Sequence, residues 1–326
     1  MKTIEVISKK HKYPIYIQNN ILDSLDDYID KLRLYVIISD DNIPKIYIER
    51  VKEKCPNNIF ITFPSGEKSK SLHEYERIID IMQTHLVPRD ACIIALGGGV
   101  TGDLSGFIAS TYMRGIDYIQ IPTTLLSQID SSIGGKVAIN TKKAKNSIGQ
   151  FYPPKIVLID PTVLKTLSKR QFNNGIAEMI KYGMICSKPL FHKLENENIK
   201  SNLEYYIYQS LLIKKYFVEK DEFDNSIRQI LNFGHTFGHA YEAYYNYDKY
   251  LHGEAISLGM LKVCENIEIK KQLEKVLLKY NLPIKDDVSE EKLIPYIKKD
   301  KKIDNDKLNL IIVNKIGEAK IKKVSF

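Results

Sequence analysis

Short, almost wholly apolar runs recur along the first half of the chain and constrain its fold more than any other feature. Turn residues lie close to each run, and the clearest runs are LYVIIS (34–39), IFITF (59–63), CIIAL (92–96) and DYIQI (117–121). Strands of a parallel sheet that are buried on both faces have such near-continuous apolar sequences. One intervening segment, LHEYERIIDIM (72–82), places apolar residues at helical spacing along one stripe. Strands that alternate with helices predict βαβ units and a doubly wound α/β sheet.

The pattern changes after residue 160. Residues 169–300 consist mostly of long helical stretches, such as residues 202–220 and 253–269. The remaining strand candidates lie near the two ends of the chain and comprise residues 3–8, 13–18, 308–313 and 319–326. We therefore predict an α/β domain over residues 1–160 and a mainly α-helical domain over residues 161–326.

The charge balance is mildly basic, because 48 Lys and Arg against 40 Asp and Glu give a formal net charge of +8 over 326 residues. The lysines are spread along the chain and no arginine-rich tract occurs, so a nucleic-acid-binding protein is not favoured. A solvated, lysine-rich surface or a site for an anionic small molecule explains the surplus.

The cysteine pattern and the length of the apolar segments indicate the cellular compartment of the protein. The four cysteines contain no CxxC pair, which favours a reduced protein over a disulfide framework. The N-terminal segment lacks the apolar core of a secretory signal, and no apolar run approaches the ~18 residues that span a membrane. We therefore expect a soluble, cytoplasmic protein with no membrane partner.

A glycine-rich turn directly follows the run CIIAL. Gly97, Gly99 and Gly102 satisfy the pattern G-x-G-x-x-G where a strand should pass into a helix. Such a turn lets the backbone approach a pyrophosphate, which then lies at the helix N-terminus. A turn needed only for tight packing is the alternative. The motif follows about the fourth strand, whereas the Rossmann fingerprint follows the first, so both interpretations stay open here.

Histidines are concentrated near residue 240. His235 and His239 lie four residues apart on one face of a predicted helix, and His252 follows in LHGEA. Glu178 lies in GIAEMIKYG, with Lys181 one helical turn further on the same face. Two imidazoles and a carboxylate suit a catalytic zinc or a similar divalent ion. Spacing alone names His235 and His239 as ligands, by analogy with H-E-x-x-H helices.

Together these segments resemble the 3-dehydroquinate synthase family of sugar phosphate cyclases. The resemblance extends from about Ser65 to Lys302 and rests on blocks in one order: SGEKSKSL, ALGGGVTGDLSGFIASTYMRGI, IPTTLLSQIDSSIGGKVAIN, KNSIGQFYPPKIVLID, GIAEMIKYG, RQILNFGHTFGHAYE and HGEAISLGM. It implies a Rossmann-like NAD-binding domain and a helical domain that binds one divalent metal ion, zinc or cobalt. The implied reaction of the shikimate pathway converts 3-deoxy-D-arabino-heptulosonate 7-phosphate, an anionic sugar-acid phosphate, into 3-dehydroquinate and phosphate.

The resemblance also implies roles for individual residues. The implied metal ligands are Glu178, His235 and His252, which differ from the pair that spacing names. Residues implied in NAD binding gather around the glycine turn and nearby loops: Asp40, Ser65, Gly66, Glu67, Lys70, Gly98, Gly99, Val100, Thr101, Gly102, Asp103, Thr123, Thr124, Lys136, Lys145 and Thr166. Residues implied in catalysis are Asp130, Lys136, Lys181, His239 and Asp224. Residues implied in substrate binding are Arg114, Asn146, Lys214, Arg228, Asn232 and Lys301 or Lys302, and Arg114 is expected to reach a neighbouring subunit of a homodimer.

Three positions depart from the family pattern. The family usually has DExExGxR before the first histidine motif, whereas this chain has Asp224 in place of the second Glu and Ser226 in place of Gly. Asn174 takes the place of a usual serine.

Two other enzyme classes share much of this pattern. They are sugar phosphate cyclases that make other carbocycles, and metal-dependent polyol dehydrogenases of the glycerol dehydrogenase type. Arg228, Asn232 and Lys214 together favour the carboxylated substrate of the synthase over the substrates of both classes.

Overall fold

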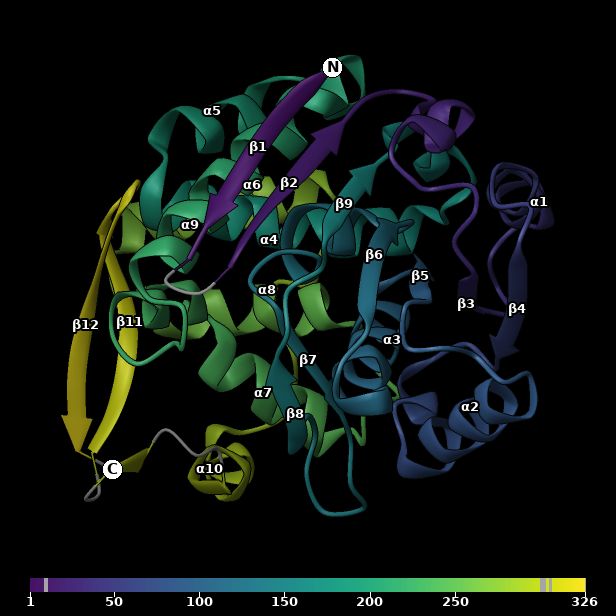
Figure 1. The fold of residues 1–326 in the computed structure, drawn as a ribbon. Coiled ribbons are helices and arrows are strands. Elements are labelled where there is room, and N and C mark those ends of the chain that lie inside the picture. Colours follow the sequence, from purple (N-terminus) through teal and green to yellow (C-terminus); the bar gives the residue numbers. More distant parts are fainter. Residues whose placement is uncertain (9–10, 300–302, 305–306, 326) are drawn as a thin grey trace. The chain divides into compact units, whose positions relative to one another are not determined.

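A computed structural model of the chain describes residues 1–8, 11–299, 303–304 and 307–325 in two compact units, Met1–Leu167 and Ser168–Phe326 (Figure 1). The sequence predicts a domain boundary after residue 160, whereas the first unit ends at Leu167. The 3-10 turn η5 (Pro161–Thr166) lies between these two positions. The turn belongs to the first unit because Val163 is buried in a core of that unit and the Thr166 hydroxyl donates to the hydroxyl of Tyr47.

The first unit is built on a seven-stranded sheet with the strand order β1-β2-β9-β6-β5-β3-β4. The strands are β1 (Lys2–Ile7), β2 (Lys12–Ile17), β3 (Tyr35–Asp40), β4 (Asn58–Phe63), β5 (Cys92–Gly97), β6 (Asp117–Pro122) and β9 (Ile156–Ile159). β1 and β2 pair antiparallel, and the other neighbouring strands pair in parallel. The four apolar runs form β3, β4, β5 and β6, so the predicted α/β fold is confirmed.

Helices cover both faces of this sheet. Val36 and Ile38 of β3 face a core that includes α2 and α3, whereas Tyr35 and Ile37 face a second core that includes η1 and α1. Successive side chains of a strand point to opposite faces, so each apolar run serves two cores. The covering elements are η1 (Ile21–Asp27), α1 (Lys45–Lys54), α2 (Leu72–Thr84) and α3 (Gly99–Thr111).

Several short elements of the first unit lie outside the predicted pattern. A two-stranded antiparallel sheet joins β7 and β8, and Val137 and Ile139 of β7 pack into the same core as α3. The short elements are η2 (Glu67–Ser69), η3 (Tyr112–Arg114), the π-helical turn η4 (Ser127–Ser131), β7 (Lys136–Ile139) and β8 (Ile148–Phe151).

The second unit is mainly helical, as predicted, and α4 lies at its centre. Residues 172–185 of α4 are all buried, and α5, α6, α8 and β12 pack against this helix. The helices and 3-10 turns are α4 (Lys169–Cys186), α5 (Lys188–Asn196), η6 (Ile199–Asn202), α6 (Leu203–Lys220), η7 (Ile227–Asn232), α7 (His235–Tyr244), α8 (His252–Val263), α9 (Ile267–Lys279) and α10 (Glu290–Lys299). An antiparallel sheet has the order β10-β11-β12 and contains β10 (Ile303–Asp304), β11 (Lys307–Lys315) and β12 (Glu318–Ser325).

One predicted helix is wrong in its extent. The stretch 253–269 reads as continuous, but the chain leaves α8 at Cys264 and enters α9 at Ile267. The reason is Asn266, whose side chain accepts hydrogen bonds from the backbone N–H groups of Glu268 and Ile269 and so begins a new helix.

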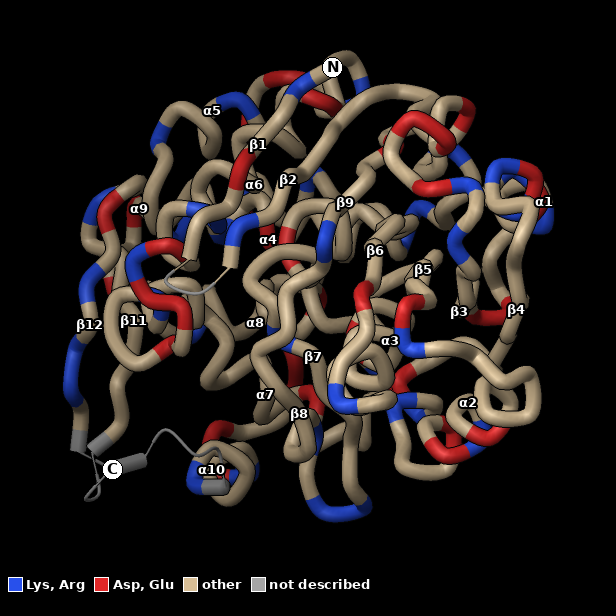
Figure 2. The backbone as a smooth tube through the Cα atoms, viewed as in Figure 1, with Lys and Arg blue, Asp and Glu red and all other residues tan. Residues whose placement is uncertain are grey.

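Charged residues of both signs are interspersed along the backbone in both units (Figure 2). The loop between β7 and β8 carries Lys142, Lys143 and Lys145. Among the helices of the described residues, none has the length and apolar character that crossing a membrane requires.

Candidate metal centre and nucleotide-binding edge

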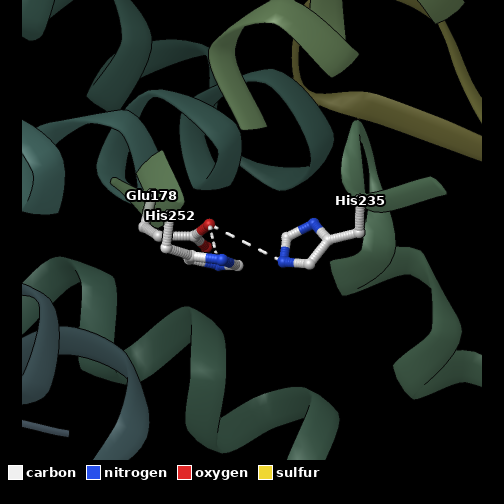
Figure 3. A group of neighbouring side chains, drawn as sticks. All are labelled: Glu178, His235 and His252. Carbon is white, nitrogen blue, oxygen red and sulfur yellow. Dashed lines mark ion pairs between the residues drawn. The ribbon is translucent and has the colours of Figure 1, made fainter. Parts of the chain in front are cut away.

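Three side chains of the second unit converge on one point (Figure 3). Glu178 lies in the middle of α4, whereas His235 and His252 are the first residues of α7 and α8. The Nε2 atoms of His235 and His252 lie 3.7 and 3.6 Å from Oε1 of Glu178. Ligand atoms of all three residues lie within 4.8 Å of one another, so one cation could lie between them after small side-chain shifts.

Glycines let the helices approach closely enough to form this group. An added Cβ at Gly253 would lie 2.1 Å from the carbonyl oxygen of Asn174 on α4, and one at Gly259 would lie 1.9 Å from the carbonyl oxygen of Gly234. Gly234 precedes α7 with a φ of +79°, a conformation that other residues rarely adopt. The sequence around the histidines therefore fixes the spacing of α4, α7 and α8 through direct backbone contact.

The second ring nitrogen sets the orientation of each histidine. Nδ1 of His235 lies 3.1 Å from the carbonyl oxygen of Phe233, and Nδ1 of His252 lies 3.4 Å from Oε1 of Glu242. With its proton on Nδ1, each neutral ring would offer the Nε2 lone pair to a cation bound beside Glu178.

The buried carboxylates of this group attract positive charge, and Lys181 already supplies part of it. Glu178 is 1% exposed, and Lys181, 2% exposed, forms an ion pair with it. Burial disfavours the charged form of His252, but the carboxylates of Glu242 and Glu178 outweigh it and raise the pKa of His252 to about 9.

The donor set fits a divalent transition-metal ion. Zinc binds imidazole nitrogen and carboxylate oxygen at about 2.0–2.2 Å, which places two ligand atoms of a tetrahedral site roughly 3.3–3.6 Å apart. The observed separations of 3.7 and 3.6 Å need little adjustment to reach that geometry. Three protein ligands would leave a fourth position for a substrate oxygen, as catalytic zinc sites do.

His239 lies one turn after His235 on α7. Its ring centroid is 5.3 Å from that of His235 and 6.0 Å from that of His252, and its ligand atom groups with Glu242 and His252 rather than with Glu178. The pair that spacing alone names, His235 and His239, is therefore not the pair that meets Glu178. The helix start at His252 brings that imidazole to Glu178 instead, because α8 packs on both α4 and α7.

In the first unit, the glycine turn lies where the winding of the sheet reverses. From β3 the chain adds β4 on one side, and it then adds β5 and β6 on the other side of β3. The carboxyl ends of β3 and β5 therefore border a topological switch point, where ligands of open α/β sheets usually bind. Asp40 ends β3, and Thr101 of α3 donates a hydrogen bond of 3.0 Å to it. Burial raises the pKa of Asp40, although this hydrogen bond opposes the shift.

Packing within the unit already requires glycine at position 97 of this turn. An added Cβ at Gly97 would lie 2.3 Å from the Thr101 hydroxyl oxygen, and one at Gly99 would lie 3.2 Å from the hydroxyl oxygen of Ser131. α3 begins directly after the turn, and no side chain caps its first residues at Gly98. The structural and the anion-binding interpretations are therefore compatible, because a helix that starts against the sheet also directs its first N–H groups outward.

A buried lysine connects several residues beside this turn. Nζ of Lys70, 3% exposed, lies 2.6 Å from Oδ2 of Asp103 and 2.5 Å from Oδ1 of Asn146. Glu67 lies 3.6 Å from Lys70 and 3.8 Å from Lys145. Burial raises the pKa of Asp103, although Lys70 opposes the shift. Residues that the resemblance assigns separately to NAD and to substrate, such as Lys70 and Asn146, thus belong to one network.

The other predicted residues of the first unit lie in α3, at the start of β7 or in loops and turns. Thr123 follows β6, and its N–H donates to the carbonyl oxygen of Gly97. Arg114 is exposed, with a φ of +66°. The rest are Val100 and Gly102 in α3, the half-buried Thr124 and Asp130, and the exposed Ser65, Gly66, Lys136 and Thr166.

The predicted substrate residues of the second unit lie on α6 and on η7. Lys214 and Arg228 are 9% and 2% exposed, and Arg228 donates to the carbonyl oxygen of Glu222 at 2.6 Å. Asn232 ends η7, three residues before His235. Lys301 and Lys302 lie outside the described residues.

The turn that departs from the family pattern is organised by Asp221. Its carboxylate accepts hydrogen bonds from the backbone N–H groups of Ser226 and Arg228, among others. Burial raises the pKa of Asp221, but these backbone hydrogen bonds outweigh it and lower the pKa overall. Asp224 occupies a left-handed position in this turn, with a φ of +60°.

Three contacts of these sites have no counterpart in the sequence prediction. Oδ1 of Asn174 accepts a hydrogen bond of 2.6 Å from the backbone N–H of Gly253, next to His252. Asn140 donates to Glu67 at 2.9 Å, and Glu242 faces His252. Glu242 has no sequence signal beyond being a polar residue in a largely apolar helical stretch, and Asn174 stands out only as a departure from the serine that is usual in the family.

Comparison with known proteins finds a matching domain family for each part of the chain. The domain family described as 3-dehydroquinate synthase N-terminal matches residues 60–174, and the one described as 3-dehydroquinate synthase C-terminal matches residues 175–303. The chain is 47% identical to the 3-dehydroquinate synthase of Dictyoglomus turgidum, over 98% of this chain and 94% of that protein.

Two solved structures share the fold. One is 2-deoxy-scyllo-inosose synthase complexed with carbaglucose-6-phosphate, NAD⁺ and Co²⁺, with a TM-score of 0.89, 24% identity and coverage of 99% of this chain and 97% of that chain. The other is 2-epi-5-epi-valiolone synthase from Streptomyces hygroscopicus subsp. jinggangensis 5008 with NAD⁺ and Zn²⁺ bound, with a TM-score of 0.88, 24% identity and coverage of 98% and 95%. The family matches and the full-length identity agree with the geometry of both units, and the chain belongs to the 3-dehydroquinate synthase family.

Proposed function

We propose that the chain converts 3-deoxy-D-arabino-heptulosonate 7-phosphate into 3-dehydroquinate and phosphate, with NAD recycled in each turnover and one zinc or cobalt ion bound. Membership of the family supports the reaction. The convergence of Glu178, His235 and His252 is the observation that carries the proposal at the level of residues.

Glu178, His235 and His252 would hold the ion. When bound, such an ion supplies Lewis acidity to a substrate hydroxyl, and NAD accepts and returns a hydride. The chain's own part is positioning: the carbonyl of Phe233 and the carboxylate of Glu242 fix the two rings, and Lys181 keeps a positive charge beside Glu178. We assign His239, on the same helix as His235, to substrate contact at this group rather than to the ligand set; its ring lies 5.3 Å from that of His235.

The turn between β5 and α3 would bind NAD. Its first helical turn offers N–H groups to a pyrophosphate, and the switch point beside Asp40 is a favourable position for a dinucleotide. Lys70 supplies a buried cation that Asp103 and Asn146 hold in place.

An anionic substrate fits the buried cations of the second unit. Lys181, Lys214 and Arg228 are each at most 9% exposed, and a guanidinium matches the planar geometry of a carboxylate. We assign the substrate carboxylate to Lys214 on α6 and Arg228 on η7, and Asn232, which ends η7, joins them in the proposed substrate set. Asp130, Lys136, Asn146 and one of Lys301 and Lys302 complete the proposed substrate set.

We further propose a homodimer in which Arg114 reaches the phosphate site of the neighbouring subunit. Arg114 is exposed and follows Met113 in an unusual left-handed pair, with φ values of +66° and +47°. Mixing Arg114→Ala chains with His235→Ala chains tests this, because a mixed dimer would contain one complete site. Recovery of activity in the mixture supports the shared site, and no recovery in mixed dimers would contradict it.

We also propose that the protein is located in the cytoplasm.

The product assay separates this function from its alternatives. The protein is incubated with the heptulosonate phosphate, NAD⁺ and Zn²⁺ or Co²⁺, and phosphate and NADH are measured together. Phosphate release without net NADH supports the synthase. Net NADH would indicate a polyol dehydrogenase, and turnover of a hexose phosphate instead would indicate another cyclase.

A further inference from the structure

Glu242 lies behind one of the three converging ligands. It is 4% exposed on α7, and its Oε1 lies 3.4 Å from Nδ1 of His252, the ring nitrogen that faces away from Glu178. The two histidines of the group are therefore supported differently. His235 uses a backbone carbonyl two residues away, whereas His252 uses a carboxylate from another helix.

The difference has a chemical consequence. A neutral histidine that offers Nε2 to a metal ion must carry its proton on Nδ1, and this N–H needs an acceptor. A carboxylate acceptor fixes the ring, selects this tautomer and increases the basicity of Nε2 more than a neutral carbonyl does. Glu242 also ties the start of α8 to α7, the helix that carries His235.

We infer that Glu242 is a positioning residue, which acts through His252 to set the affinity of the metal centre. The inference rests on the proposed function only in that Glu178, His235 and His252 hold the ion.

The same atoms allow a competing arrangement. Ligand atoms of His239, Glu242 and His252 also lie within 4.8 Å of one another and could hold a second ion. His252 would then bind one ion through each nitrogen, which requires the loss of its last ring proton. A neutral imidazole holds that proton strongly, so the positioning role is favoured.

Metal titration of three variants tests the inference without substrate or NAD. Metal-free wild type, Glu242→Gln and Glu242→Leu are titrated with Co²⁺ against a competing chelator, and the visible Co²⁺ spectrum is recorded. We expect Glu242→Leu to bind Co²⁺ roughly 10- to 100-fold more weakly, with an altered spectrum, because the ring loses its acceptor. We expect a smaller loss for Glu242→Gln, because the amide oxygen still accepts the Nδ1 proton.

The chain offers a matched control. Glu195 on α5 faces Nδ1 of His192 at the same distance, 3.4 Å, but neither residue is in the ligand group. Glu195→Leu should leave Co²⁺ affinity and spectrum unchanged, even where it lowers thermal stability.

The outcomes separate this inference from the proposed function. If Glu178→Ala abolishes Co²⁺ binding while Glu242→Leu binds like wild type, the inference fails and the proposed metal centre stands. Two Co²⁺ ions per wild-type chain, reduced to one in Glu242→Leu, would also overturn it, in favour of a second ion. If Glu178→Ala binds Co²⁺ like wild type, the proposed centre and the inference fail together.

Discussion

The two units build their candidate sites in opposite ways. In the first, the glycine turn is local in sequence, because β5, the turn and the start of α3 follow one another directly. In the second, Glu178, His235 and His252 come from three helices, and their meeting depends on helix packing. A local turn tolerates changes elsewhere in the fold, whereas a site assembled by packing is sensitive to every contact between its helices.

The largest effect is expected from the ligands themselves. Alanine at Glu178, His235 or His252 should abolish Co²⁺ or Zn²⁺ binding, because the two remaining ligands cannot complete the site. His239→Ala should keep the ion and lose turnover. Metal content after gel filtration measures this. Loss of the ion in His239→Ala, with retention in His252→Ala, would restore the pair that spacing names.

The next effect tests helix packing. In Gly259→Ala the new methyl group would overlap the carbonyl oxygen of Gly234 at 1.9 Å and the nitrogen of Gly238 at 2.7 Å. Because both neighbours are backbone, α7 and α8 must separate, and we expect the free energy of unfolding to fall by about 1–3 kcal/mol or more and metal affinity to fall with it. Gly99→Ala is the control, because its nearest neighbour is the Ser131 side chain at 3.2 Å. Equal losses of stability in both variants would contradict the comparison.

Asn174 tests the link between α4 and α8. Asn174→Ala removes the acceptor of the 2.6 Å hydrogen bond from the backbone N–H of Gly253. Because this buried N–H then has no hydrogen-bond acceptor, the free energy of unfolding should fall by about 1–3 kcal/mol. Asn174→Ser restores the residue usual in the family and a possible acceptor, so its loss should be smaller. Chemical denaturation of both variants measures the difference. A larger loss in the serine variant would show that this hydrogen bond is not what stabilises the helix pair.

The smallest effect is pH-dependent and concerns the loop that leads to His252. Asp286 accepts hydrogen bonds from the hydroxyls of Tyr245 and Tyr250 and pairs with Lys249 at 2.7 Å. Burial raises the pKa of Asp286, but these contacts outweigh it and lower the pKa to about 2. Because the unfolded carboxyl takes up its proton at higher pH, the stabilisation is complete above about pH 4 and is lost as the pH falls toward 2.

The variant Asp286→Asn checks this contribution. We expect its deficit in the free energy of unfolding to be on the order of 1–2 kcal/mol at neutral pH and to shrink between about pH 4 and pH 3. A deficit that stays constant over this interval would show that the charge of Asp286 does not stabilise the loop.

The sequence predicts the elements better than the contacts between them. The apolar runs identify β3 to β6 because burial on both faces leaves a strong local signal. The β7–β8 hairpin has only four residues in each strand, which is too short for a clear period. In the site, the repeat of His235 and His239 is visible in sequence, but whether His239 or His252 meets Glu178 depends on how α8 packs. Glu242 and Asn174 act across helices, so no spacing rule reveals them.

The most direct test of the account is a double titration of NAD⁺ and Co²⁺ into wild type, Gly99→Ala and Glu178→Ala. The account predicts that Gly99→Ala loses NAD⁺ affinity, because a side chain at the start of α3 hinders the approach of a pyrophosphate to the turn, and keeps Co²⁺ affinity. It predicts the reverse for Glu178→Ala, which should lose Co²⁺ and keep NAD⁺. Unchanged NAD⁺ affinity in a folded Gly99→Ala protein, or unchanged Co²⁺ affinity in Glu178→Ala, would contradict the assignment of one site to each unit.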